Sequence, residues 1–178
     1  MKAAEPTRLA PAALITFLAY AHILSAMCWL GGGILTGFVL SPSLQLLTPP
    51  ARLEFSAKIL PKIIRFVQVA AGSTLLFGLL LLYTYYDGNF TFLHTTTQGY
   101  ELSAGILLAV VVTVIAFAVT IPAFKAISRI SNSLLQGGQQ PPPPELAKYG
   151  KRAMVASILS LVILLVVLAM MVSVGFPF

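Results

Sequence analysis

Four long apolar stretches divide the chain, with short polar segments between them. They run from about 12 to 40, 62 to 86, 100 to 123 and 153 to 174. A helix that crosses a lipid bilayer needs about 20 consecutive, mostly apolar residues, so each stretch is long enough to span. The pattern therefore predicts an all-α integral membrane protein, a four-helix bundle in which all 178 residues form a single transmembrane domain.

A short amphipathic segment separates the first two apolar stretches. Between residues 51 and 60, Leu53 and Ala57 fall on one side of a helix and charged residues fall on the other. Glu54 precedes Lys58 by four positions, a spacing at which opposite charges attract along a helix. The pattern predicts a short amphipathic interfacial helix between helices one and two, lying on the membrane surface.

Prolines mark the predicted ends of several helices. Proline lacks the backbone N–H that a helix interior needs, so Ser41-Pro42 is expected to end the first span and Pro122 to kink or end the third. The segment 128–140 is expected to be polar and flexible. Residues 141–144 predict a stiff polyproline spacer, and the last helix is expected to begin at Pro144.

The first span has two different faces when its residues are placed at about 100° per residue. One face is small and polar and carries one large ring, whereas the other is uniformly apolar. In lipid the small, polar face is expected to pack inward, because small residues let backbones approach and polar groups need partners. The inward set is His22, Ser25, Ala26, Trp29, Gly33, Thr36 and Gly37, and the outward set is Ile23, Leu24, Met27, Leu30 and Ile34. Gly31, Gly32 and Gly33 are expected to mark a close helix crossing, and Gly33 with Gly37 forms a small-xxx-small pair.

The second span carries a stripe with one carboxamide and two tyrosines. Gln68 is the one carboxamide in any span and is expected to find a partner within the bundle. Tyr83 and Tyr86 lie at the far end, where aromatic residues commonly form a belt at the membrane surface. The stripe as a whole comprises Arg65, Gln68, Gly72, Leu76, Leu79, Tyr83 and Tyr86.

Composition and charge exclude several classes of protein. The chain is 58% hydrophobic and 9% charged, whereas soluble domains carry about 25% charged residues, so no separate soluble domain is expected. The net charge of +6 does not indicate a nucleic-acid partner, because the basic residues lie beside the spans. The single cysteine excludes an internal disulfide and a cysteine-based zinc site. No phosphate-binding loop, carboxylate pair or nucleophilic triad is present.

The positions of the basic residues predict an orientation. The first and third connections contain several lysines and arginines, whereas the second connection, residues 87–99, contains none. Cytoplasmic loops carry the excess of Lys and Arg. We therefore expect a protein of the plasma membrane with both termini outside. Its expected partner is the lipid bilayer, and the sequence leaves undecided whether it also forms a homo-oligomer or joins a larger membrane complex.

The opening of the first span resembles a known family. His22, six residues, Trp29 and then Leu30-Gly31-Gly32, with Ser41-Pro42 further on, resembles the first helix of the copper-resistance D (CopD) family. It is also similar to the HemJ-type protoporphyrinogen oxidase family, and the likeness extends loosely through the basic segment 55–65 to Gly72. The first family is associated with copper uptake or tolerance. The second binds heme b through its helix-one histidine and oxidises a porphyrinogen.

This resemblance implies a site centred on His22, as the ligand of a metal or of heme b, with Trp29 as its packing neighbour. Tyr83 of the second span is expected to lie at the same outer depth as His22 and to line the opposite wall of this site. His94 in the second connection is a candidate second ligand. Copper(I) prefers Met and Cys, but helical geometry turns Met27 and Cys28 away from His22.

Two functions stay open. The first is a protein that handles heme b or copper at His22. The second is a non-catalytic accessory subunit of a larger respiratory or metal-handling membrane complex, or a four-helix protein without a cofactor, in which His22 is hydrogen-bonded to a neighbouring helix. An enzyme is the less expected outcome. The chain has no Pro-Arg pair after the first span and, apart from Lys62 and Arg65 at the start of the second, no basic residue within a later span, which departs from the HemJ-type pattern.

Overall fold

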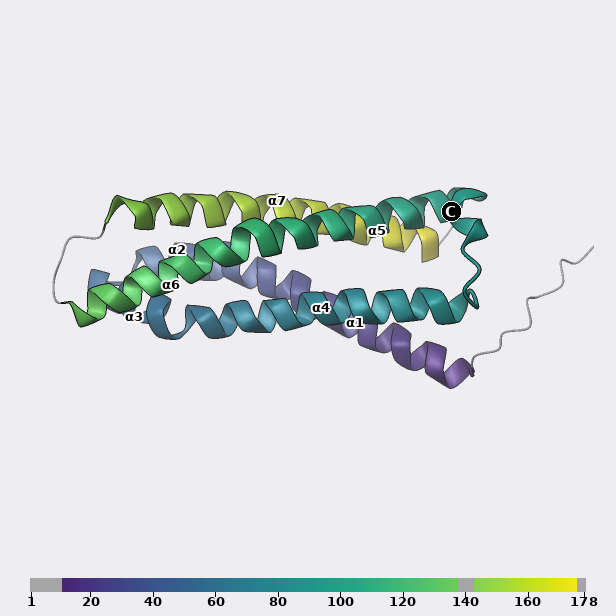
Figure 1. Ribbon diagram of the computed structural model, residues 1–178, viewed down its shortest axis with the longest axis horizontal. Helices are drawn as coiled ribbons and strands as arrows, with labels where there is room; N and C mark the ends of the chain where they lie inside the picture. Colours follow the sequence, from purple (N-terminus) through teal and green to yellow (C-terminus); the bar gives the residue numbers. More distant parts are fainter. Residues whose placement is uncertain (1–10, 138–142, 176–178) are drawn as a thin grey trace, which may run out of the picture.

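The structure is a computed structural model that describes residues 11–137 and 143–175. Over these residues the chain is helical and has no strand. Four helical stretches are long and apolar enough to cross a membrane, namely Ala12–Gln45, Pro49–Tyr85, Thr97–Gln136 and Pro144–Ser173. The prediction of an all-α protein with four membrane-spanning helices is confirmed at this level (Figure 1).

The helices follow one another with short breaks. In chain order they are α1 (Ala12–Ile34), the π-helical η1 (Leu35–Leu40), α2 (Ser41–Gln45), α3 (Pro49–Lys58), α4 (Leu60–Tyr85), the 3₁₀ turn η2 (Thr91–His94), α5 (Thr97–Ile115), the π-helical η3 (Ala116–Thr120), α6 (Ile121–Gln136) and α7 (Pro144–Gly175). The predicted spans 62–86 and 153–174 match α4 and α7 closely. The other two spans extend beyond their predicted ends.

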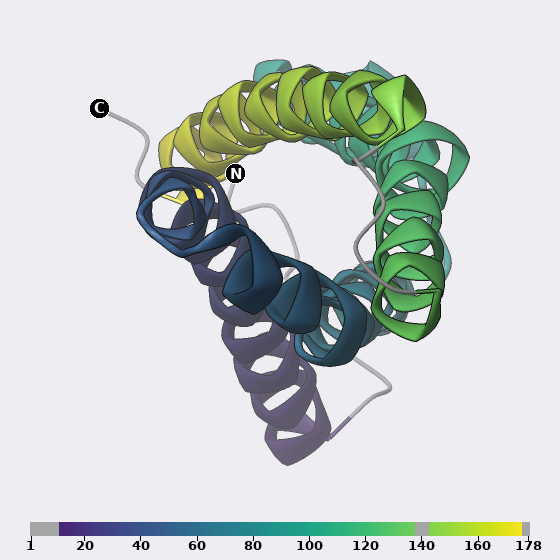
Figure 2. The same ribbon diagram turned by 90° about the vertical axis from the view of Figure 1, so that its left-hand side faces the viewer.

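Two helix pairs make up the bundle. Helix α1 packs along α4, and α5 packs along α7, while α6 contacts both α3 and α7. Viewed from the end that carries α2 and α3, the helices are arranged in a ring (Figure 2). Both views show the first half of α1 leaning away from α5 and α7, so that α4 is its neighbour there.

Helices one and three continue past Pro42 and Pro122. The predicted end of the first span at Ser41-Pro42 is therefore wrong. Pro42 and Pro122 are the second residues of α2 and α6, and a π-helical segment comes directly before each of these helices. Proline is tolerated in the first turn of a helix, where its N–H has no required partner. In the π-helical segments before these prolines, each hydrogen bond spans five residues and not four. The helix therefore continues although proline donates no backbone hydrogen bond.

The segment after Pro122 is also more ordered than predicted. The flexible segment expected from residue 128 is helical as far as Gln136, so that prediction is wrong there. Ser128 and Ser131 are buried, and the Ser128 hydroxyl donates to the carbonyl oxygen of Ala57 in α3 at 3.4 Å. Serine is small enough to pack between helices, so a segment that contains serines can be buried although its composition is polar. Residues 138–142, with the rest of the expected linker and the first two of the four prolines, lie outside the described residues, and α7 begins at Pro144 as predicted.

The predicted amphipathic segment forms helix α3. Lys58 donates to Glu54 with Nζ and Oε1 2.6 Å apart, which confirms the predicted pair. Ser56 and Ala57 are buried, and only Ile59 separates α3 from α4. The position of α3 on a membrane surface stays a prediction.

Candidate functional site

His22 of α1 reaches across to the backbone of α4. Its ring nitrogen Nδ1 lies 2.9 Å from the carbonyl oxygen of Thr74, and the side chain is half-buried. A carbonyl oxygen can only accept a hydrogen bond, so Nδ1 carries the proton and donates it. The hydrogen bond with α4 therefore uses Nδ1 and leaves Nε2 outside it.

A glycine of α4 makes room for this imidazole. A Cβ atom on Gly78 would lie 2.8 Å from Cε1 of His22 and 2.9 Å from Nδ1, too close for any side chain unless the ring moved. Thr74, one turn earlier, is buried, and its hydroxyl donates back to the carbonyl of Ala70 at 2.8 Å. Thr74 and Gly78 therefore form the seat of His22. The sequence analysis missed both, and the signal that could have found them is the spacing of small residues at Ala71, Thr74 and Gly78.

The close crossing of α1 and α4 lies at Gly32, the middle one of the three consecutive glycines in α1. A Cβ on Gly32 would lie 2.9 Å from Cγ2 of Val67, whereas a Cβ on Gly33 or Gly37 would meet nothing within 4 Å. The close crossing expected at glycines 31–33 is thus confirmed at Gly32, whereas the pair Gly33 and Gly37 makes no such contact. Gly32 continues the line of His22 and Trp29 along α1, which is the side that meets α4.

The predicted inner and outer faces of α1 agree with the structure. Ile23, Leu24 and Met27 are more than half exposed, whereas Trp29 is only 6% exposed. Trp29 belongs to a core cluster with Ala70 and Ala71 of α4 and Val112 of α5, against which Cys28 also packs. It is thus the point at which the two helix pairs meet.

A central cavity of about 320 Å³ lies beside Trp29, toward the end of the bundle that carries α3. Its walls come from α1, α3, α4, α6, α7 and both π-helical segments, and most of its lining is apolar. Thr36 of η1 donates to the carbonyl of Gly32 at 2.6 Å. The buried hydroxyl of Thr120 in η3 has no hydrogen-bond partner among the described residues. Both threonines line this cavity, as do Gly33 and Gly37, whereas His22 does not.

Tyr83 and His94 lie near the other end of the bundle. Tyr83 is 62% exposed, and its ring lies against Gly88 and Phe90 in the connection after α4. His94 is exposed in η2, and its carbonyl accepts a hydrogen bond from the Tyr100 hydroxyl at 2.7 Å. Within the described part of the chain, no hydrogen bond or ring contact joins Tyr83 or His94 to His22.

The surroundings of His22 do not fit a copper site. Among residues 11–137 and 143–175, no three His, Cys, Asp or Glu side chains come together in a group that could hold a metal ion. Met27 is 66% exposed, and Cys28 packs against the Trp29 cluster. The hydrogen bond of Nδ1 leaves Nε2 as the nitrogen that could ligate heme, but the central cavity is lined by other residues and not by His22.

Comparison with known proteins adds no assignment, because no family model, curated protein or solved structure matches this chain.

Proposed function

We propose that the protein is a non-catalytic membrane protein that acts as an accessory subunit, and that His22 serves to hold α1 against α4. The observation that carries this proposal is the hydrogen bond from Nδ1 to the Thr74 carbonyl, with Gly78 against the ring. A polar side chain in a span needs such a partner, because lipid offers none. Many large apolar side chains on all four spans are exposed, which leaves faces for lipid or for other subunits of a homo-oligomer or larger complex.

A role in binding heme b is the second candidate. One observation favours it: a histidine that ligates a metal commonly donates its other ring nitrogen to a carbonyl, as Nδ1 of His22 does. The CopD-like opening of the first helix points in the same direction. Copper is the weaker variant of this candidate, because its soft ligands are missing around His22.

Removal of His22 separates the two candidates. We expect the wild type, produced with added heme and copper, to carry neither after purification, and His22→Ala to lower the free energy of unfolding by about 1–2 kcal/mol. Absorption spectra, metal analysis and unfolding in detergent micelles measure these quantities. Tyr20→Ala is the matched control, because Tyr20 lies on α1 and is 72% exposed. A heme absorption band that His22→Ala abolishes would replace the accessory proposal with the second candidate.

The proposed orientation places both termini outside the cell in the plasma membrane. The support is the Lys- and Arg-free connection 87–99 against the two basic connections. In a Cys28→Ala background, Thr95→Cys should react with an impermeant thiol reagent added outside intact cells, because Thr95 is exposed in the second connection. Ser133→Cys, on an exposed position of α6, should react only after the cells are opened. The reverse labelling pattern would contradict this orientation.

A further inference from the structure

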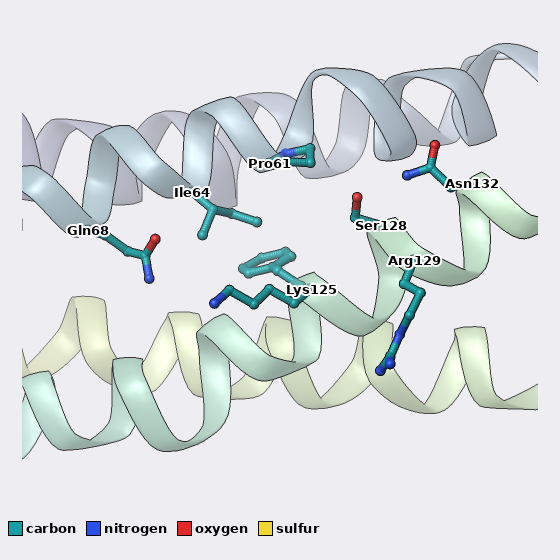
Figure 3. A pocket seen from close by; sticks show the side chains of 8 residues that line it. Pro61, Ile64, Gln68, Lys125, Ser128, Arg129 and Asn132 are labelled. Carbon is teal, nitrogen blue, oxygen red and sulfur yellow. The ribbon is translucent and has the colours of Figure 1, made fainter.

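A second pocket, of about 340 Å³, lies between α4 and α6 at the end of the bundle that carries the basic connections. Figure 3 shows polar side chains from both helices around it. Lys125 of α6 extends along the pocket toward Gln68 of α4, whereas the Ser128 hydroxyl points toward α3 and donates to the carbonyl of Ala57 there. Arg129 lies at the rim and turns away from α4.

The two charged side chains of this pocket, Lys125 and Arg129, form no ion pair among the described residues. The lining contains two basic side chains and no acidic one. Lys125 forms no ion pair with any carboxylate of the described ranges. The Gln68 carboxamide, which was expected to find a bundle partner, also makes no hydrogen bond within those ranges. A cation and an amide donor that face each other across a pocket form a site for an anionic group.

The pocket borders the central cavity. Ile64, Gln68 and Phe124 line both spaces, so the two spaces adjoin at these side chains. The pocket is polar at Lys125, and the cavity beyond is about 320 Å³ and mostly apolar. Sites for small molecules typically measure about 300–1,000 Å³. A polar mouth beside an apolar interior matches a ligand with an anionic head and a hydrocarbon tail.

We propose that the pocket between α4 and α6 binds an anionic phospholipid. The phosphate lies beside Lys125 and Gln68, and one acyl chain passes Ile64 and Phe124 into the central cavity, where it reaches Trp29. Basic pockets between membrane helices are suited to such headgroups. A lipid is favoured over free phosphate because the cavity behind the charged group is apolar. This inference goes beyond the proposed function and does not depend on the role of His22.

Trp29 offers a direct test, because it is the only tryptophan of the chain, it is 6% exposed and it lines the cavity. The protein is reconstituted in phosphatidylcholine vesicles that contain a small fraction of lipid with brominated chains, which quench tryptophan on contact. Brominated phosphatidylglycerol should quench Trp29 at about a fivefold lower fraction than brominated phosphatidylcholine does. This factor corresponds to about 1 kcal/mol for one lysine near an anionic headgroup.

Two pairs of variants locate the site. Lys125→Ala should remove the preference for phosphatidylglycerol and Lys125→Arg should keep it, whereas Lys148→Ala, an exposed position on α7 outside the pocket, should leave it unchanged. Gly33→Leu should reduce quenching by both lipids, because its side chain would fill the cavity. Gly31→Leu is its matched control, since a Cβ on either glycine meets nothing within 4 Å but only Gly33 lines the cavity.

Two results would overturn the proposal. The first is equal quenching of Trp29 by brominated phosphatidylglycerol and phosphatidylcholine, or a preference that survives in Lys125→Ala. The second is a stabilisation of the micellar protein by inorganic phosphate alone that matches the effect of phosphatidylglycerol, together with no quenching by brominated chains. That second result would identify a phosphate site without a chain-binding cavity.

Discussion

The Gly78→Ala protein is expected to unfold more easily than the wild type, although alanine is the better helix former. The added methyl group would lie 2.8 Å from the His22 ring. The ring must then move away from α4 and lose its hydrogen bond to the Thr74 carbonyl. We expect the free energy of unfolding to fall by about 1–2 kcal/mol, the combined cost of overpacking and a lost hydrogen bond. Unfolding in detergent micelles measures it.

The same substitution should change sign when His22 is absent. In a His22→Ala background nothing blocks the methyl group, so Gly78→Ala should stabilise α4 by up to about 1 kcal/mol through helix propensity. Gly72→Ala, on the same helix and with nothing within 4 Å of its Cβ, should stabilise in both backgrounds. An equal effect of Gly78→Ala with and without His22 would mean that the two residues do not act as a pair.

A larger loss is expected for Gly99→Ala, at the start of α5. A Cβ on Gly99 would run into the backbone of Phe92 and Leu93 in η2, which cannot turn aside as a side chain can. The Ser103 hydroxyl holds the same segment by donating to the carbonyl of Leu93 at 3.1 Å. Moving η2 off α5 should cost about 3 kcal/mol.

Gly105→Ala is the matched control for this prediction. Gly105 lies on the same helix and is also buried, but its Cβ would meet only the end of the Met171 side chain, which is flexible. We expect a change within about 1 kcal/mol there. Thermal unfolding in micelles and proteolysis of the connection 87–99 report both variants. A Gly99→Ala protein as stable and as resistant to protease as Gly105→Ala would show that η2 is not held against α5.

The sequence alone was enough to predict the four spans and the inner face of the first helix. Composition and length determine the spans, because an apolar stretch of this length has few other stable states in a membrane. The inner face of α1 was predictable because His22, Ser25 and Trp29 differ clearly from Ile23 and Leu24 on the other side. The pair Glu54 and Lys58 depends only on local spacing, so it too was predictable.

The inner face of α4 was not predictable in the same way. Leu76, Leu79 and Tyr83, which were placed on one stripe with Gln68, are all more than half exposed. Apolar residues surround α4 on every side, since lipid and a neighbouring helix select the same side chains. The contact with His22 depends instead on two small residues, Thr74 and Gly78. Their importance follows from the position of a neighbouring helix, which the sequence of α4 does not contain.

The candidate site follows the same division. His22 and Trp29 were chosen from the contrast within one helix, and the structure places both on the side of α1 that meets α4. His94 was chosen by its depth in the membrane, and Tyr83 by its depth together with its place on the stripe of Gln68. Depth does not fix the direction of a side chain, and both residues are exposed near the far end of the bundle.

The two π-helical segments change how residue positions must be counted along helices one and three. A π turn holds about one residue more than an α turn, so every position after it is rotated by about 100° relative to an unbroken α-helix. Residues 41–45 and 121–136 therefore face directions that cannot be extrapolated from α1 and α5. Deleting one residue from η1 or η3 would reset that phase and turn the following helix to present a different side to its neighbours. An insertion or deletion at either place therefore acts mainly by rotating the following helix about its axis, and much less by changing its length.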